Sequence, residues 1–322
     1  MDPRHFTRPF LSLLTVILLL AAPPLSASGG DGRLLARRAM GEKSGIVIEK
    51  LSYLSGGLKV RGLLFTPRHE GGARLPCVIF CHDGISGISR EHRLSSIRLA
   101  RMGYAVFCPS YRGEDGSEGT VEIAKGEVTD VLSAMKLCAG LDGIEGSRMA
   151  LAGASHGALI CVLAAARTSE PKALVAVYGV MDIYRWWQYL RDQGKLGADG
   201  ISTRTYGKGP DDRPLSFQIR NGLGVAGKIK CPVLILQGEK DTTVPAEQAR
   251  LLRDELLRHG ISVEMEIYPH CAHGFLIYVP WLPDRDILKG EREETEKAWK
   301  TMEEFLERHL KQERSPCGGK AR

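Results

Sequence analysis

The chain has 322 residues, of which 43% are hydrophobic and 25% charged, and its formal net charge is +6. This composition is ordinary for a globular protein and argues against a disordered, collagen-like or disulfide-dominated chain. The positive charges are interleaved with acidic residues along the chain. The sequence therefore does not predict a nucleic-acid partner, which would require basic residues clustered on one face.

The first 27 residues have the layout of an export signal. Two arginines precede an apolar run from Phe10 to Ala22, and a proline pair and small residues follow it. The run is shorter than the ~20 residues that a membrane-spanning helix needs. We therefore expect cleavage after Ala27, export to the periplasm or the medium, and no stable membrane insertion afterwards. A membrane anchor formed by the uncleaved signal is the alternative.

The segment that follows, 28–44, is rich in Gly and Arg and is predicted to be flexible. Hydrophobic residues then alternate along 46–51 and 58–65, on either side of a Ser-Gly-Gly turn, which predicts an antiparallel hairpin. From Pro76 onward the pattern changes to continuous apolar runs separated by amphipathic stretches. Strands that are apolar throughout and alternate with helices are typical of a parallel sheet covered on both faces.

The predicted strands of this sheet are 77–81, 104–108, 149–152, 173–178, 232–236 and 263–268. The predicted helices are 90–101, 122–141, 156–167, 246–259 and 291–311. The sequence therefore predicts one α/β domain over residues 45–312, with a mostly parallel sheet, an N-terminal antiparallel hairpin and helices on both faces. A disordered tail is predicted at 313–322.

One irregular stretch, 181–230, separates two of the predicted strands and contains Trp186, Trp187 and Tyr189. An insertion of this length between two strands is predicted to be lid-like or to form a pocket wall.

Eight cysteines occur in the chain, and several lie in or beside strand-like runs, as Cys77, Cys81, Cys108 and Cys231 do. A buried free cysteine behaves as a small hydrophobic residue, and this is our interpretation of them. Export would permit a disulfide, and the sequence leaves that possibility open. No two pairs have the spacing of a zinc site.

The strongest chemical motif is Gly153-Ala154-Ser155-His156-Gly157, which lies between a predicted strand and a predicted helix. At such a junction the two glycines permit a turn tight enough to hold the serine hydroxyl above the sheet. The N–H groups at the start of the helix point to the region where an oxyanion would form. The motif therefore predicts Ser155 as a nucleophile.

A serine hydroxyl needs a base in order to attack at neutral pH. Asp241 and His273 each follow a predicted strand. Because the carboxyl ends of neighbouring parallel strands meet at one edge of a sheet, these residues can meet Ser155 there. We predict His273 as the base and Asp241 as the residue that orients it.

Other residues could fill the same roles. Asp182 and Glu239 are alternatives for the acid, but Asp241 lies in a loop that ends in Val-Pro, the usual place for it. His270 is an alternative for the base, but His273 is followed by a glycine, which favours an exposed tight turn. The histidines and the cysteine in this short run lack a second ligand pair, so a metal site is not predicted.

Acyl transfer through a tetrahedral intermediate needs two hydrogen-bond donors for the developing oxyanion. The backbone N–H of His156, next to the nucleophile, and that of Asp83, after the strand 77–81, are the predicted donors. A plain turn before a helix is the alternative interpretation of Asp83.

These motifs together resemble the catalytic domain of the prolyl oligopeptidase family and the related dienelactone-hydrolase-like esterases. The motifs are His82-Asp83-Gly84, Tyr111-Arg112-Gly113-Glu114-Asp115-Gly116, Gly153 to Gly157, Gln237 to Asp241 with Val244-Pro245, and His273-Gly274-Phe275. The resemblance covers about residues 46–311. It implies an α/β-hydrolase fold, a triad of Ser155, Asp241 and His273, and no cofactor.

Four residues are predicted to contact substrate. His82 and Tyr111 lie within motifs of this resemblance, and Trp186 and Trp187 lie in the predicted insertion.

The chain departs from the family pattern in three ways. Only a short segment is predicted before the first strand, where large oligopeptidases carry a β-propeller. His82-Asp83-Gly84 stands where His-Gly-Gly is usual, and Ser155 stands where dienelactone hydrolases have cysteine.

The sequence thus predicts an exported serine hydrolase that acts on a small carboxylic ester. A prolyl-oligopeptidase-like serine peptidase that cleaves short peptides or amides is the alternative. A non-catalytic binding protein on the same fold is a second alternative. The oligomeric state is not predicted.

Overall fold

The computed structural model describes residues 30–68, 72–196, 200–282 and 289–311. The predicted export signal, 1–27, and the predicted tail, 313–322, lie outside the described residues. In the described part of the chain, no helix is long and apolar enough to cross a membrane.

Nine strands form one sheet, in the order β1-β2-β3-β5-β4-β6-β7-β8-β9. The strands are β1 (Leu34–Lys43), β2 (Ile46–Ser55), β3 (Leu58–Pro67), β4 (Leu75–Cys81), β5 (Ala105–Pro109), β6 (Ile144–Ala154), β7 (Ala173–Val177), β8 (Val233–Gly238) and β9 (Val263–Tyr268). The first three strands and β5 pair antiparallel, and the strands from β5 across to β9 pair parallel. The mixed, mostly parallel sheet with an N-terminal hairpin is therefore confirmed.

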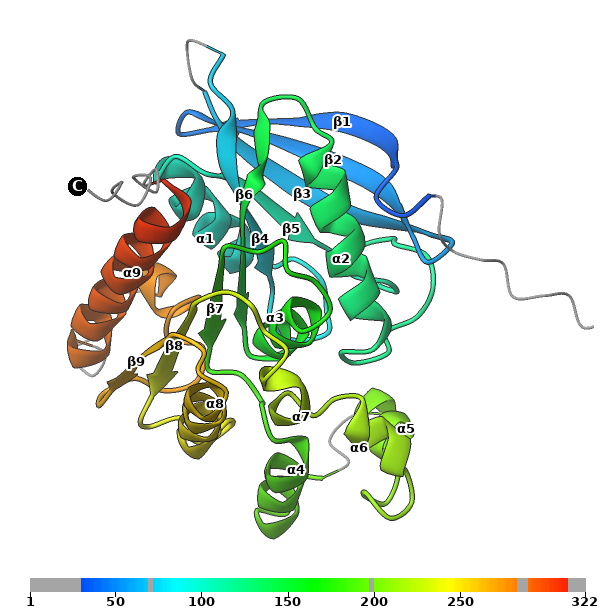
Figure 1. The fold of residues 1–322 in the computed structure, drawn as a ribbon, viewed down its shortest axis with the longest axis vertical. Helices are drawn as coiled ribbons and strands as arrows, with labels where there is room; N and C mark the ends of the chain where they lie inside the picture. The colour runs from blue at the N-terminus through cyan, green and yellow to red at the C-terminus, as the bar shows by residue number, and fades with distance from the viewer. Residues whose placement is uncertain (1–29, 69–71, 197–199, 283–288, 312–322) are drawn as a thin grey trace, which may run out of the picture.

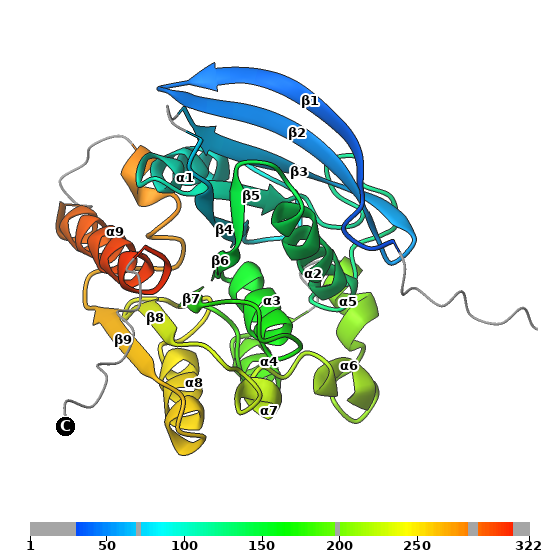
Figure 2. The same ribbon diagram turned by 45° about the horizontal axis from the view of Figure 1, so that its top comes forward.

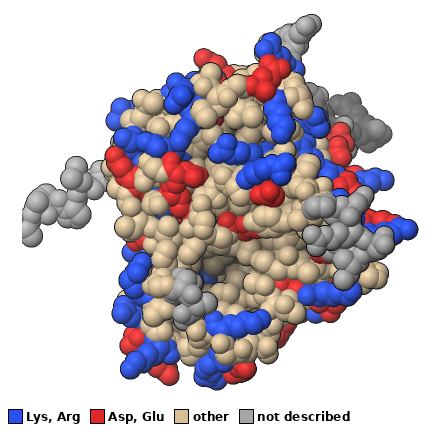
Figure 3. Space-filling model, turned by 180° about the vertical axis from the view of Figure 1, so that it is seen from behind, with Lys and Arg blue, Asp and Glu red and all other residues tan. Residues whose placement is uncertain are grey.

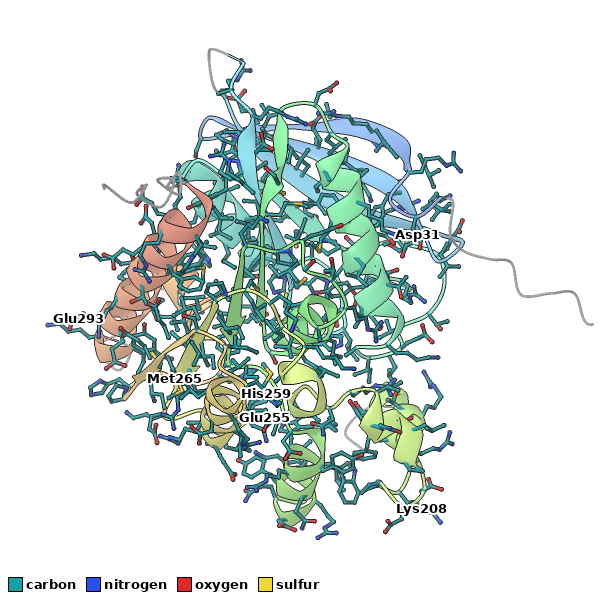
Figure 4. All side chains as sticks on the ribbon, viewed as in Figure 1. Asp31, Lys208, Glu255, His259, Met265 and Glu293 are labelled. Carbon is teal, nitrogen blue, oxygen red and sulfur yellow. The ribbon has the colours of Figure 1, made fainter. Side chains whose placement is uncertain are left out.

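Helices cover both faces of the sheet (Figure 1). One face carries α1 (Arg90–Arg101) and α9 (Lys289–Leu310), and the other carries α2 (Gly126–Ala139), α3 (His156–Ala165) and α8 (Glu247–Arg258). Every residue of β5, β7 and β8 is buried, because helices cover these strands on both sides. The side chains of the two layers fill the space between sheet and helices (Figure 4).

The first strand, β1, corrects one expectation. Residues 34–43 were predicted within a flexible segment, but they pair with β2 along most of their length at the sheet edge. Figure 2 shows β1, β2 and β3 curving together along one edge of the molecule. Every residue of β1 is exposed, so it has no hydrophobic alternation to reveal it. Its backbone pairing and the ion pair between Arg37 and Glu49, at 2.6 Å, fix it instead.

The insertion between β7 and β8 is mostly helical. It contains α4 (Ile183–Asp192), α5 (Gly200–Tyr206), α6 (Pro214–Gln218) and α7 (Leu223–Ala226). Phe217 and Tyr206 of this insertion pack in a small hydrophobic cluster with Val244, which follows β8, and Ile123, which precedes α2. The insertion therefore packs against loops at the carboxyl ends of the strands, and Lys208 marks its outer end (Figure 4).

The seven described cysteines are all free and all buried. The eighth, Cys317, lies outside the described residues. No disulfide therefore joins the described cysteines, which fill core positions on both faces of the sheet.

Candidate active site

Ser155 occupies a sharp turn between β6 and α3. Its backbone has φ 50° and ψ −116°, a conformation that a residue with a side chain rarely adopts. A Cβ on Gly157 would overlap the backbone of Cys81 and His82, and one on Gly153 would overlap Gly157. The motif thus folds tightly because its two glycines leave room for backbone on both sides of the serine.

The Ser155 side chain lies at the end of a chain of hydrogen bonds. His273, which follows β9, has its Nε2 3.1 Å from Ser155 Oγ. Its Nδ1 lies 2.7 Å from Oδ2 of Asp241, which follows β8. Because a carboxylate only accepts, Nδ1 carries a proton and Nε2 is left to accept one from the serine. The Tyr178 ring packs edge-on against the imidazole, with centroids 4.8 Å apart.

Asp241 is held as rigidly as the histidine. Only 5% exposed, it accepts hydrogen bonds at Oδ1 from the N–H groups of Thr243 at 2.9 Å and Val244 at 2.8 Å. Gln237 donates to Oδ2 at 3.3 Å. These contacts hold the carboxylate in place beside Nδ1 of His273.

The alternative residues have other partners. Asp182 accepts from the first N–H groups of α4 and caps that helix. Glu239 forms an ion pair with Arg250 at 2.7 Å. His270 turns away from Ser155 and bonds Glu294 at 2.7 Å. Among the described interactions, no hydrogen bond or ion pair joins any of these three to Ser155 or His273.

The two backbone groups predicted as oxyanion donors are uncommitted. Neither the N–H of Asp83 nor that of His156 donates to another described residue. The His156 ring bonds the carbonyl of Gly84 at 2.9 Å, which joins the start of α3 to the loop after β4.

The Asp83 side chain ties the same loop to two other elements. Its Oδ1 accepts from His92 of α1 at 2.8 Å and from the hydroxyl of Tyr278 at 2.7 Å. Burial alone would raise the pKa of Asp83, but these hydrogen bonds, together with the electrostatic effect of His92 and His82, outweigh it, so the pKa lies below its ordinary value. Asp83, which stands where the family pattern has glycine, is therefore ionised at neutral pH and held in place by its hydrogen bonds to His92 and Tyr278.

A small apolar pocket opens beside Ser155, with a volume of about 140 Å³. It is lined by Ile85, Ile123, Ser155, His156, Leu159, Val180, Ile183, Trp186, Ser202, Tyr206, Thr243 and Val244. None of these described lining residues is Lys, Arg, Asp or Glu. Figure 3 shows one face of the molecule with a hollow whose surroundings are mostly uncharged.

Comparison with known proteins decides the family. The family model described as the dienelactone hydrolase family matches residues 60–310. The chain belongs to the dienelactone hydrolase family.

Two relatives are similar to this dienelactone hydrolase family member over most of its length. An uncharacterized peptidase, YtmA of Bacillus subtilis (strain 168), is 29% identical over 226 residues, which cover 70% of this chain and 85% of the relative. A putative carboxymethylenebutenolidase of Salmonella typhimurium is 25% identical over 253 residues, which cover 74% and 79%.

Solved structures show the same fold. An acylaminoacyl peptidase in complex with Z-Gly-Gly-Phe-chloromethyl ketone is similar with a TM-score of 0.69 and 21% identity. The match covers 85% of this chain and 43% of that chain, so this protein spans less than half of the solved peptidase. The family assignment makes the chain an enzyme of the serine hydrolase type, and the solved structure shares its α/β-hydrolase fold.

Of the predicted substrate contacts in this dienelactone hydrolase family member, only Trp186 lines the pocket. His82 and Tyr111 are 0% exposed and stack on each other beneath the site, with centroids 4.3 Å apart. Trp187 lies against Phe217 and faces a separate hollow of the insertion. These three residues do not line the pocket beside Ser155, and their contact with substrate stays a prediction.

Most of the pocket wall was missed by sequence reasoning. Ile85, Ile123 and Val244 come from loops after three different strands, Val180 lies between β7 and the insertion, and Tyr206 comes from the insertion. In the sequence these residues look like ordinary core positions. Val244 belongs to a motif of the resemblance, but no motif marks it or the others as pocket residues, because only the fold brings them together.

Among the described residues, no group of three or more His, Cys, Asp or Glu side chains could hold a metal ion. His270 and His273 point to different partners, so the short run that contains them does not form a ligand set.

Proposed function

We propose that this protein hydrolyses carboxylic esters by acyl transfer, with Ser155 as nucleophile, His273 as base and Asp241 as the orienting acid. The observation that carries the proposal is the continuous hydrogen bonding from Asp241 through His273 to Ser155 Oγ. A hydroxyl activated in this way is what acyl transfer needs.

The reaction follows from this geometry. Ser155 Oγ attacks the carbonyl carbon while Nε2 of His273 takes its proton. The N–H groups of His156 and Asp83 stabilise the oxyanion, a contribution of about 3 kcal/mol for each donor. The imidazolium, stabilised by Asp241, then protonates the leaving group. Water attacks the acyl-enzyme with His273 again as base.

We favour an ester over a peptide as the substrate because the pocket beside Ser155 is apolar. Its described lining offers no charged side chain to bind the free amino terminus of a peptide. The family description and the putative carboxymethylenebutenolidase also favour this class of substrate. The alternative, cleavage of short peptides or amides, is favoured by the relative named as a peptidase.

A substrate panel on wild type and Ser155→Ala tests the proposal. We expect wild type to cleave p-nitrophenyl acetate and butyrate faster than aminoacyl or dipeptidyl p-nitroanilides. Loss of the nucleophile should lower kcat by several orders of magnitude. Faster cleavage of the anilides would favour the peptidase. Equal activity in both proteins would contradict Ser155 as the nucleophile, and no activity in wild type would favour a non-catalytic binding protein.

Export through a signal at 1–27 is a separate proposal, based on the sequence pattern alone. N-terminal sequencing of the exported protein should give a start after Ala27. A start at Met1 would contradict cleavage.

A further inference from the structure

The loop before α2 has an unusual backbone. Ile123 and Ala124 have φ values of 51° and 52°, in the left-handed region. A β-branched residue is a particular outlier there, because its Cβ substituents crowd the backbone. Such a conformation persists only when its surroundings impose it, and it often marks a functional constraint.

One constraint is the carboxylate of Glu127, in the first turn of α2. It is 1% exposed and accepts hydrogen bonds from the backbone N–H groups of Glu122 at 2.6 Å, Ile123 at 3.0 Å and Lys125 at 3.0 Å. A single buried charge therefore holds three N–H groups of the loop.

A second constraint comes from the insertion. Arg220, just after α6, is 4% exposed and donates to the carbonyl of Ile123 and, at 2.6 Å, to that of Glu122. A third bond, at 2.8 Å, joins it to the carbonyl of Ser216 in α6. Glu127 and Arg220 thus hold the N–H and C=O groups of the same loop. Burial lowers the pKa of Arg220, and the nearby Glu127 carboxylate acts in the opposite direction.

The residue held in this way forms a wall of the pocket beside Ser155. Ile123 is 8% exposed and lines the pocket together with Ser155 and His156. His273, which would protonate the leaving group, does not line it. The pocket therefore lies on the acyl side of the proposed reaction.

We propose that Ile123, held in place by Glu127 and Arg220, sets the length of the apolar acyl group that the pocket accepts. The inference rests on the ester hydrolysis proposed above and names its substrate class. A dry apolar cavity of ~150 Å³ holds a molecule of about benzene size. The pocket, at about 140 Å³, therefore fits an uncharged acyl chain of about four to six carbons.

The test is a series of p-nitrophenyl esters from acetate to decanoate. For wild type, kcat/KM should rise roughly fourfold per methylene up to the preferred length and then fall. For Ile123→Ala the preferred length should increase by two to three carbons. Ile97→Ala is the matched control, because Ile97 lies on α1, is 5% exposed and does not line the pocket. It should keep the wild-type preference.

Arg220 is tested as a positioning residue in the same series. Arg220→Met removes the donors and should shift the preference toward longer chains, as Ile123→Ala does. Arg220→Lys keeps a donor and should restore the wild-type preference. If Ile123→Ala does not fold, Ile123→Val should shift the preference by about one carbon, since it removes one methyl-sized group.

The outcomes separate the two proposals. Ester hydrolysis with the same preferred length in wild type, Ile123→Ala and Ile97→Ala would overturn the role of Ile123 and leave the hydrolase mechanism intact. A wild-type protein that cleaves none of the esters would overturn both.

Discussion

At the residue scale, the partner of each titratable side chain separates the proposed acid from its alternatives. Asp241 is buried and faces Nδ1 of His273, whereas Glu239 is exposed and paired with Arg250. These two carboxylates are two positions apart in the sequence. The sequence favoured Asp241 only because it lies in a loop that ends in Val-Pro, the usual place for the acid.

Replacement of Asp241 tests its orienting role. Asp241→Asn would present an amide to Nδ1 and favour the wrong tautomer, so kcat should fall about ten-thousandfold with little change in KM. Glu239→Gln is the matched control and should retain wild-type kinetics. Steady-state rates with p-nitrophenyl butyrate measure both. An Asp241→Asn variant within tenfold of wild type would contradict the role.

Asp83 gives a prediction about pH. Its pKa in the folded chain lies below its ordinary value of 3.8. A carboxyl with a lower pKa in the folded state stabilises the fold above its unfolded pKa, and this contribution is lost as the pH falls through the folded pKa. The difference in free energy of unfolding between wild type and Asp83→Asn should therefore be constant above about pH 5 and shrink below about pH 4.

Urea unfolding at a series of pH values measures this difference. In a Tyr278→Phe background one of the two donors to Asp83 is gone, so the change with pH should be smaller. A difference that grew on acidification would contradict the assignment.

At the scale of elements, the sequence predicted those whose burial leaves a periodic or continuous apolar pattern. The strands from β4 to β9 and helices α1, α3, α8 and α9 lie within a few residues of their predicted positions, except that β6 begins five residues earlier, at Ile144. The edge strand β1 was missed because backbone pairing rather than burial fixes it. The pocket wall was missed because loop residues such as Ile123 acquire their role only through the tertiary fold.

The turn at Ser155 gives a prediction at this scale. Gly157→Ala would force a Cβ into the backbone at the end of β4 and should lower the free energy of unfolding by about 1–3 kcal/mol. Gly224→Ala in α7 is the control, since its nearest neighbour would be 3.5 Å away. It should leave stability unchanged or raise it by up to about 1 kcal/mol. Thermal or urea unfolding compares the two, and equal effects would contradict the tight packing of the turn.

At the scale of the whole molecule, one sheet with helices on both faces brings the ends of β6, β8 and β9 to one edge, where Ser155, Asp241 and His273 meet. The same two layers bury all seven described cysteines. Burial raises the pKa of the Cys231 thiol to about 12, so little reactive thiolate forms at neutral pH.

The thiols therefore report on the integrity of the fold. The seven described cysteines should react slowly with a thiol reagent such as DTNB in the native protein and rapidly once it is unfolded in guanidinium. A reductant should leave the thermal midpoint unchanged. Rapid reaction of all seven under native conditions would contradict their burial.

The central claim is that Ser155 is an activated nucleophile, and covalent labelling tests it most directly. Wild type, Ser155→Ala and the control Ser147→Ala, a surface serine on β6, would be treated with a fluorophosphonate and the modified peptide identified by mass spectrometry. We predict one adduct, on Ser155, in wild type and Ser147→Ala, and no adduct in Ser155→Ala. An unlabelled wild type, or equal labelling of Ser155→Ala, would contradict the account.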